Sequence, residues 1–244
     1  MTEFTTWRSL VDGNEIVAIP DSVVLDYSAE TWTQGDSVWE DNNNVADMSI
    51  VGSPTKTTLD SGEDAIRTDG TDDYGLITMP SQLEGDDMQQ MAIEWRFGGF
   101  SSTADPLRAW GVGGESGDTR MFLTLNVDLD FNSDPGNFRF DIRDASDDRI
   151  VCSPASNPNI NDNNDHDIVI DVVDSTNSDV DVYIDGSSVN LNFSDQQNPS
   201  NFGNFSTDMA VWAFNNAGDV SGETQFNMAK MRWHNETIGG GTFD

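Results

Sequence analysis

Hydrophobic and polar residues alternate with a period of two along most of this 244-residue chain. The clearest stretch is 121–131, where apolar residues occupy every odd position and Thr, Asn and Asp fill the even positions from 124 to 130. Successive side chains of a β-strand point to opposite faces of a sheet. The pattern therefore predicts one long strand over 121–131, with Met121 through Phe131 on the core face and the Asp residues in solvent.

Shorter segments repeat this alternation. They are 91–97, 138–142 and 180–184, and the last is followed by Asp185-Gly186, a dipeptide that favours a tight hairpin turn. No helical period of useful length is present. Stretches rich in Asn, Asp, Gly, Ser and Pro separate the segments and predict loops. Many short strands joined by such loops are typical of a β-sandwich, so we expect an all-β fold of two antiparallel sheets.

The N-terminal residues differ from the rest. Their short apolar run, Ile16 to Ile19, ends at Pro20 and lies outside the regular alternation. We expect residues 1–22 to form an arm or docking segment and residues 23–244 to form one sandwich domain, a length that a single all-β domain commonly reaches.

The chain is strongly acidic, and this is its most informative compositional feature. It carries 44 acidic residues, 34 of them Asp, against 11 basic ones, for a formal net charge of −33. In dilute buffer this charge would push the folded state apart. At about 1 M salt the Debye length falls to about 3 Å and the repulsion is screened. The composition therefore predicts a halophilic protein with an acidic surface. The chain has no basic stripe to meet phosphates, so nucleic-acid binding is not expected.

Three further features of the sequence bear on where the protein is found in or outside the cell. Cys152 is the only cysteine, so no intrachain disulfide forms. No stretch approaches the ~20 apolar residues of a membrane span, so membrane insertion is not expected. The start, Met1 to Phe4, lacks the basic and apolar regions of a secretory signal. Release with assembled virus particles is one other route, and we expect a virion-surface or extracellular location in high salt.

Four segments occur in the same order as motifs of a known family: Trp39–Asn44 with Met48–Thr55, Ala65–Tyr74, His166–Ile170 with Val180–Gly186, and Phe226–Asn235. They resemble the laminin-G-like branch of the concanavalin A-like lectin and glucanase domains. The resemblance implies a concanavalin A-like jelly roll of two stacked antiparallel sheets. It also implies glycan or protein binding on a loop rim or on the concave sheet and, in many members, one bound Ca²⁺.

One candidate metal site stands out from the residues themselves. Asp128, Asp130, Asn132 and Asp134 form an oxygen-rich D-x-D-x-N-x-D spacing of the kind that Ca²⁺ prefers. An EF-hand is excluded, because Arg139 stands where its twelfth-position Glu would be. The alternative is a strand whose Asp-bearing solvent face runs into a turn.

Glycan contact would require exposed aromatic rings beside polar groups. Trp32, Trp39, Phe100 and Trp110 lie in or beside predicted loops and are the candidate ligand-binding residues. The alternative for each is packing in the core or along its rim.

The chemistry of a glycan hydrolase is not visible. Enzymes with the fold that the resemblance implies use a strand reading E-x-D-x-x-E, and retaining hydrolysis needs two carboxyl groups about 5–5.5 Å apart. The stretch Glu84-Gly85-Asp86 begins this way, but Gln89 stands in place of the second Glu. We therefore expect no catalytic residues.

Together these observations predict a non-catalytic surface module of a halophilic virus or cell. A virion spike, turret or fibre component that recognises a host surface glycan or glycoprotein is the leading hypothesis, with other virion proteins and further copies of itself, as a homo-oligomer, as partners. A purely architectural capsid or tail decoration protein without a ligand is the second hypothesis. A glycan hydrolase with an unrecognised site is the third.

Overall fold

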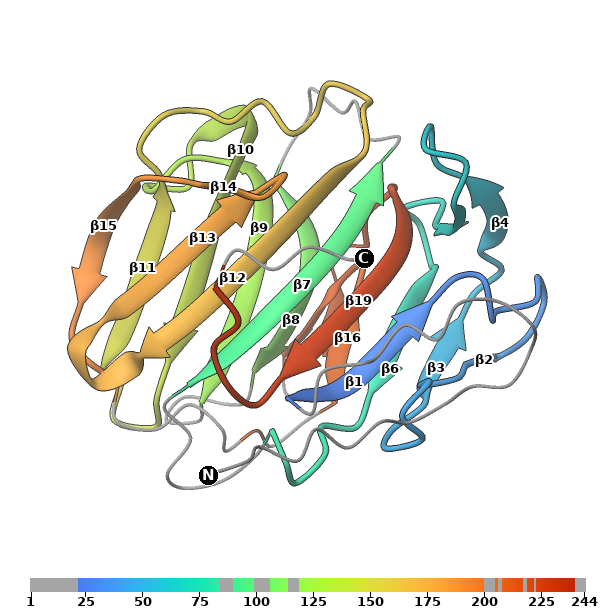
Figure 1. The fold of residues 1–244 in the computed structure, drawn as a ribbon, viewed down its shortest axis with the longest axis horizontal. Helices are drawn as coiled ribbons and strands as arrows, with labels where there is room; N and C mark the ends of the chain where they lie inside the picture. Colours follow the sequence, from blue (N-terminus) through green and yellow to red (C-terminus); the bar gives the residue numbers. More distant parts are fainter. Residues whose placement is uncertain are drawn as a thin grey trace, which may run out of the picture.

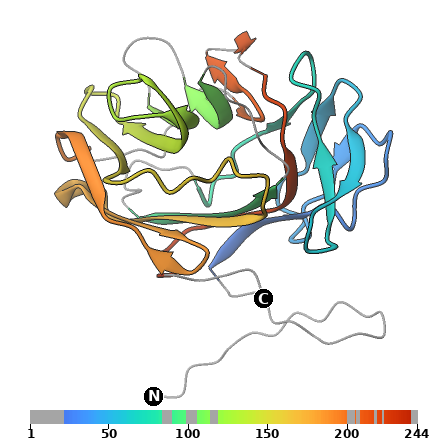
Figure 2. The ribbon, with the colours of Figure 1, turned by 90° about the horizontal axis from the view of Figure 1, so that it is seen from above.

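The computed structural model describes residues 22–83, 90–98, 106–113, 119–199, 205, 208–216, 219–221 and 223–239. They form a jelly-roll sandwich of two sheets that face one another across a single core (Figures 1 and 2). The one helical element in these ranges is a 3-10 turn, η1 (Ser175–Asn177). The predicted all-β class, with two antiparallel sheets, is confirmed.

The first sheet has eight strands, in the order β14-β13-β12-β7-β19-β5-β4, with β1 also paired to β19. Its strands join both ends of the chain, because β1 and the C-terminal β19 lie side by side. The bounds are β1 (Val23–Ser28), β4 (Thr55–Thr58), β5 (Asp64–Arg67), β7 (Met91–Gly98), β12 (His166–Asp174), β13 (Asp179–Ile184), β14 (Ser187–Ser188) and β19 (Asn227–His234).

The second sheet has eleven strands, in the order β15-β11-β10-β9-β8-β16-β6-β3-β2, with β17 beside β8 and β18 beside β17. The pairing of β17 with β8 is parallel, and the other pairings of this sheet are antiparallel. The bounds are β2 (Val38–Trp39), β3 (Met48–Val51), β6 (Tyr74–Ile77), β8 (Leu107–Gly113), β9 (Arg120–Val127), β10 (Ser133–Arg143), β11 (Arg149–Pro154), β15 (Leu191–Gln196), β16 (Met209–Val211), β17 (Phe214–Asn216) and β18 (Asp219–Ser221).

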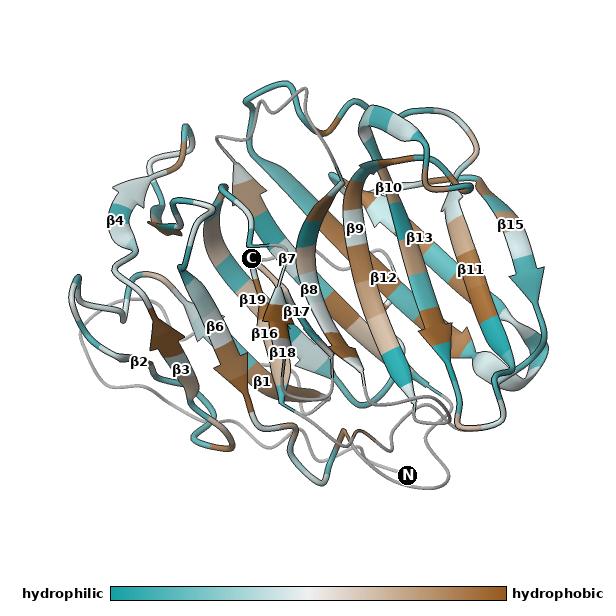
Figure 3. Ribbon diagram, turned by 180° about the vertical axis from the view of Figure 1, so that it is seen from behind, coloured by the Kyte–Doolittle hydropathy of each residue, from teal (hydrophilic) through white to brown (hydrophobic). Residues whose placement is uncertain are grey.

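Aromatic side chains fill the space between the sheets. Trp110 of β8 packs edge-on against Trp233 of β19, with ring centroids 5.6 Å apart, so one contact joins the two layers. Trp39 stacks on Trp212 at 6.0 Å. Viewed from behind, the ribbon shows hydrophilic and hydrophobic segments alternating along the strands, as the period of two requires (Figure 3).

The predicted strands over 91–97, 138–142 and 180–184 are confirmed as β7, β10 and β13. The strand predicted over 121–131 is wrong in its extent, because β9 ends at Val127. The backbone N–H of Asp128 donates to the carbonyl of Asn132, which closes a turn there. Phe131 adopts a left-handed conformation (φ 63°) and is 38% exposed, so it lies outside the core.

The first described strand, β1, begins at Val23. Residues 1–21 lie outside the described ranges, so the arm expected over 1–22 stays a prediction. The described part of the chain contains no helix with the length and hydropathy that a membrane span requires.

One face of the second sheet carries the candidate site. Along β10, Phe138, Phe140 and Ile142 are fully buried in the core. The residues between them, Arg139 and Asp141, together with Arg143 at the strand end, point to the opposite face. Neighbouring positions of β8, β9 and β11 add to the same face.

Candidate functional site

The outer face of the second sheet holds a pocket with an unusual lining for so acidic a chain. Its volume is about 290 Å³. Five of the nine arginines of the sequence line it, together with two phenylalanines and one aspartate. We call it the arginine pocket, and its residues are Arg108, Arg120, Phe122, Phe131, Arg139, Asp141, Arg143 and Arg149.

Strand register explains how distant residues meet there. Arg143 of β10 lies directly opposite Arg120 of β9 on one side and Arg149 of β11 on the other, so three arginines form one row across three strands. Directly opposite residues in antiparallel strands have Cβ atoms about 4.5–5.5 Å apart. One pleat away, Asp141 faces Phe122 in the next row of the same face.

A third row closes the far side of the pocket. Arg139 of β10 and Arg108 of β8 both lie opposite Thr124 of β9, and the Arg108 guanidinium donates to the Thr124 hydroxyl. The Arg139 guanidinium donates to the carboxylate of Asp141 at 2.8 Å and to the carbonyl of Leu129 at 2.8 Å. The single acidic residue of the lining is therefore already bound to an arginine.

Two phenylalanine rings complete the walls. The guanidinium of Arg139 lies 3.8 Å from the ring centre of Phe131, and that of Arg108 lies 5.1 Å from the ring centre of Phe122. These distances are those of cation–π contacts. The two rings are 6.5 Å apart, so the pocket offers apolar faces beside several donors of hydrogen bonds.

The electrostatics of the pocket differ from one arginine to the next. Burial lowers the pKa of the Arg108 guanidinium, an effect that Asp141 opposes and Arg139 reinforces. Burial and then the charge of Arg143 lower the pKa of Arg120. At the rim, the hydrogen bond to Asp195 raises the pKa of Arg149. The two lowered values have a common cause, which is positive charge that is partly removed from water.

The residues predicted to bind Ca²⁺ form the turn at one edge of this pocket. One carboxylate oxygen of Asp128 accepts the backbone N–H groups of Asp130 and Asn132, and the other accepts the Asn132 side-chain amide at 2.9 Å. The hydrogen bonds from Asn132 lower the pKa of Asp128. This turn holds Phe131 in its left-handed conformation over Arg139.

The remaining members of that predicted set point to other partners. The carboxylate of Asp134 accepts the side-chain amides of Asn137 and Asn157 at 2.8 and 2.7 Å. Asp130 is exposed. Within the described residues, the one group of three carboxylates whose oxygens lie within 4.8 Å of one another is elsewhere. The structure therefore does not bring Asp128, Asp130 and Asp134 together, because the chain turns between them.

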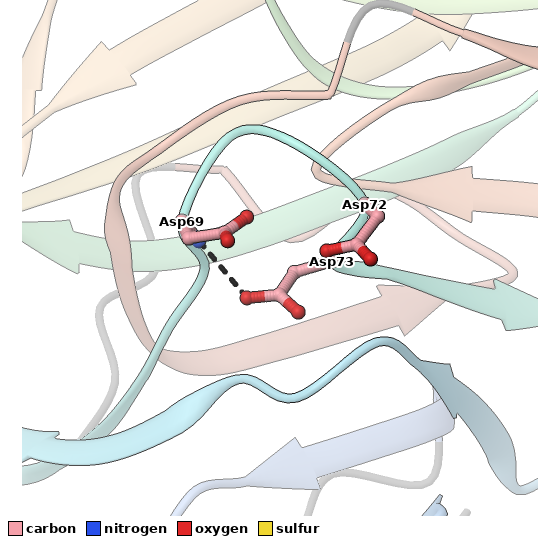
Figure 4. Close-up of side chains that lie close together, drawn as sticks. All are labelled: Asp69, Asp72 and Asp73. Carbon is pink, nitrogen blue, oxygen red and sulfur yellow. Dashed lines mark hydrogen bonds between the residues drawn. The ribbon is translucent and has the colours of Figure 1, made fainter.

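The group that does converge is Asp69, Asp72 and Asp73, in the turn between β5 and β6 (Figure 4). The buried carboxylate of Asp73 accepts the backbone N–H groups of Ser53 at 2.6 Å and of Asp69 at 3.0 Å. A Cβ on Gly52 would lie 2.2 Å from this carboxylate, so the turn requires glycine there. Asp73 is thus the turn-capping residue of this loop.

The tryptophans predicted to contact glycans lie elsewhere than expected. Trp39 and Trp110 are fully buried, and the Trp39 indole N–H donates to the carbonyl of Ser28 at 2.8 Å. Trp32 is 2% exposed and reaches only the wall of a pocket of about 200 Å³. Trp39 lies in β2 and Trp110 in β8, and all three rings belong to the core cluster, so core packing describes them better. Phe100 lies outside the described residues.

A serine, a histidine and a carboxylate meet on the first sheet, as in some hydrolases. Ser22 Oγ lies 3.1 Å from His234 Nδ1, and His234 Nε2 lies 3.2 Å from a carboxylate oxygen of Glu94. All three side chains are buried, and Glu94 also lies 3.8 Å from Arg232. A substrate has no access to a serine covered in this way, so the geometry fits a network that ties β1, β7 and β19 together.

Comparisons with known proteins agree with the fold. No family model matches the chain, and no curated protein matches its sequence. Solved structures do match, among them the binding domain of Paraclostridial Mosquitocidal Protein 1, with a TM-score of 0.65 at 11% identity. The binding domain of botulinum neurotoxin DC in complex with rat synaptotagmin II matches with a TM-score of 0.62 at 9% identity.

Each of these matches covers 90% of this chain but only about half of the other, 50% for the first and 49% for the second. The same is true of a botulinum neurotoxin type C structure described as dependent on two ganglioside molecules for cell entry, at 10% identity and a TM-score of 0.61. At such identities the likeness shows the sandwich fold alone.

Proposed function

We propose that this chain is a non-catalytic module that recognises glycans at a surface, and that the arginine pocket is its binding site. The observation that carries the proposal is the pocket itself, where ring faces and guanidinium groups line one hollow. Binding sites for small polar ligands combine apolar and aromatic walls with a few directed polar groups. A sugar offers an apolar ring face and hydroxyl oxygens, which match these walls and donors.

The structural neighbours support this choice of ligand. One is described as dependent on gangliosides for cell entry, and another binding domain was solved in complex with SialylT. Those ligands belong to the toxins, and the fold alone does not transfer them. They show that sandwiches of this shape occur in proteins whose task is recognition at a cell surface.

We place the module in high salt, on the surface of a virion or outside the cell, as a spike, turret or fibre component. The net charge of −33 supports this setting, because dense brine screens the repulsion that the charge creates. We expect the free energy of unfolding to rise steeply with KCl concentration. A free energy that is independent of KCl would argue against a halophilic origin.

A purely architectural role has less support. Permanent interfaces between proteins are rich in apolar surface. Among the described residues, the large apolar side chains that stay exposed are Val38, Val45 and Phe131, and Phe131 already packs on Arg139. Contact with other virion proteins, assembly into a homo-oligomer and binding of Ca²⁺ all stay predictions.

The test is binding of the purified, folded protein to intact halophilic archaeal cells in multimolar salt, with free glycans as competitors. We expect saturable binding that glycans compete away and that fails in a variant with Arg139→Gln and Phe131→Ala. Binding that no glycan displaces would favour a protein receptor. Absence of binding to every host tested would favour the architectural role.

A further inference from the structure

The arginine pocket also indicates the charge of its ligand. In antiparallel sheets, like charges directly opposite one another destabilise the pairing. The row Arg149–Arg143–Arg120 places three such charges side by side across β11, β10 and β9. A row of this kind is stabilised when an anion lies between its members.

The carboxylates of the protein itself do not fill that position. Arg143 donates to Asp147, which is 70% exposed at the end of the β10–β11 hairpin, and Arg149 donates to Asp195 on the edge strand β15. The Nε of Arg120 is buried and has no hydrogen-bond partner in the described ranges, and no described carboxylate forms an ion pair with the Arg120 side chain. In the described part of the chain, Arg143 and Arg149 therefore each have a counter-charge, and Arg120 has none.

Several donors inside the pocket are unused. The Nε atoms of Arg120, Arg139 and Arg143 are buried and have no hydrogen-bond partner among the described residues. Arg139 is only 9% exposed, so water reaches its Nε poorly. A buried charged donor without an acceptor is costly, and an oxyanion is the acceptor that a guanidinium binds best, often through two parallel bonds.

The local charge is opposite to that of the chain. Five arginines and one aspartate give the lining a formal charge of +4, whereas the whole chain carries −33. Carboxylates were available in large excess, with 44 acidic residues against 11 basic ones. Among the described residues of the lining, Asp141 is the one carboxylate, so the excess of positive charge is a local property of the pocket.

Space is left beside the row for a ligand. The positions of β8 that lie opposite Phe122 and Arg120 are Gly111 and Gly113, which carry no side chains. The exposed ring of Phe131 stands at the other side, over Arg139. An anionic group at Arg120 and Arg143 would thus leave an attached ring lying toward the phenylalanines.

We propose that the ligand is an anionic glycan, whose sulfate or carboxylate group binds the row of Arg120, Arg143 and Arg149 and whose sugar ring lies against Phe122 and Phe131. This deepens the proposed function and rests on it. Sulfate and carboxylate share the chemistry that the guanidinium groups recognise, which is oxygen with negative charge.

The experiment compares matched ligands by calorimetry on the folded protein at one fixed, high salt concentration. The probes are a carrageenan oligosaccharide, the same oligosaccharide after removal of its sulfate groups, an oligogalacturonate of equal length, inorganic sulfate and vesicles of anionic phospholipid. We expect the sulfated sugar, the uronate or both to bind at least about tenfold more tightly than the desulfated sugar. The better of the two identifies the anion.

The variants locate the binding. Arg120→Gln removes a guanidinium that has no ion-pair partner among the described residues, so we expect it to weaken binding of the anionic sugar about tenfold while the fold is retained. Arg120→Lys should restore only part of the affinity, because an ammonium lacks the planar fork. Arg67→Gln removes the same charge from an exposed position on β5 and should leave the affinity unchanged within about twofold.

Three other outcomes would each overturn a different part of the proposal. Equal binding of sulfated and desulfated sugar would overturn the anionic ligand and leave glycan recognition standing. Binding of phospholipid vesicles or inorganic sulfate without binding of any sugar would overturn the glycan and with it the proposed function. Tight binding of anionic sugar that Arg120→Gln does not weaken would overturn this pocket as the site.

Discussion

The two sheets of this sandwich differ in how completely their cations are paired, and Arg96 and Arg120 show the contrast. On the first sheet, Arg96 donates to both oxygens of Asp167 at 2.6 and 2.7 Å and to Glu63 at 2.8 Å, and Lys230 binds the other oxygen of Glu63 at 2.7 Å. On the second sheet, Arg120 has no such partner in the described part of the chain. The hydrogen bonds that Arg96 donates to Asp167 and Glu63 raise the pKa of Arg96, whereas burial and Arg143 lower the pKa of Arg120.

The difference separates two uses of the same side chain. A paired arginine inside a network stabilises the fold, because its charge is neutralised and its donors are satisfied. An unpaired arginine in a hollow stabilises whatever anion enters. Arg96 is therefore a structural residue of the first sheet, whereas Arg120 on the second sheet is available to an anion, as the proposed site requires.

The largest effect is expected from Arg96→Gln. The change leaves Asp167 without its counter-charge and Glu63 with Lys230 alone, in a partly buried position, so we expect the free energy of unfolding to fall by about 2 kcal/mol. Urea denaturation at fixed salt measures it. The control, Arg67→Gln, should change the free energy by less than about 0.5 kcal/mol. A loss no larger than that of the control would show that the network contributes little.

Acid should weaken the paired sheet before it affects the pocket. Burial alone would raise the pKa of Glu63, but the hydrogen bonds from Lys230 and Arg96 outweigh it and lower the pKa. A lowered folded-state pKa gives stability that is present above the unfolded pKa, about 4.3, and is lost as the pH falls through the folded value. We expect Glu63→Gln to remove part of this acid dependence of the unfolding free energy.

Anion binding in the pocket should show no matching loss in that range, because guanidinium groups stay protonated. Affinity for a sulfated oligosaccharide should be constant from about pH 9 down through about pH 4, as far as the protein stays folded. An affinity that followed the titration of a carboxyl or imidazole group would indicate that a group other than the arginines controls binding.

A smaller effect is expected from Phe131→Ala. The ring lies over the Arg139 guanidinium and is 38% exposed, so its loss should weaken sugar binding about fivefold with little effect on stability. Val45→Ala truncates an apolar side chain that is similarly exposed, at 37%. Val45 lies between β2 and β3, at the far end of the second sheet's strand order, so this change should leave binding unchanged. Equal affinities for the two variants would remove Phe131 from the site.

The smallest effect, and the one of opposite sign to Arg96→Gln, is that of Arg120→Gln on stability. Without ligand, removal of one charge from a row of like charges should raise the free energy of unfolding by about 0.5 kcal/mol. The same urea titrations measure it. A loss of 1 kcal/mol or more would mean that Arg120 has a structural partner, and the contrast between the sheets would fail.

The alternation along the chain was enough to predict the fold and most of the central strands. It failed at 128–131, because a carboxylate that caps a turn has the same polarity as one on the solvent face of a strand. Asp128 is of the first kind, and its turn removes Phe131 from the core face. Polarity alone does not distinguish the two cases.

The arginine pocket was not predicted, although the sequence of β10 contains part of the pattern that forms it. Arg139, Asp141 and Arg143 alternate with the core residues of β10, which places them together on the outer face. Whether they meet Arg120 and Arg149 depends on register, and a slip of one residue would send each to the other face. The three candidate tryptophans turn inward for a related reason, because a position beside a predicted loop does not tell which way a ring such as Trp39 points, and Phe100 stays a prediction.

The strands at the ends of each sheet's main path are short or polar, which affects how closely copies of the protein can pack. In the main path of the first sheet, one end strand is the two-residue β14 and the other is β4, which reads Thr-Lys-Thr-Thr. In the main path of the second sheet, one end strand is the two-residue β2 and the other is β15, which exposes Asn192, Ser194 and Gln196. Exposed edges that are long and apolar recruit strands from other molecules and lead to aggregation. Edges this short or this polar give a neighbouring chain little to pair with. At these four edges, neighbouring copies can therefore stand close together without exchanging strands.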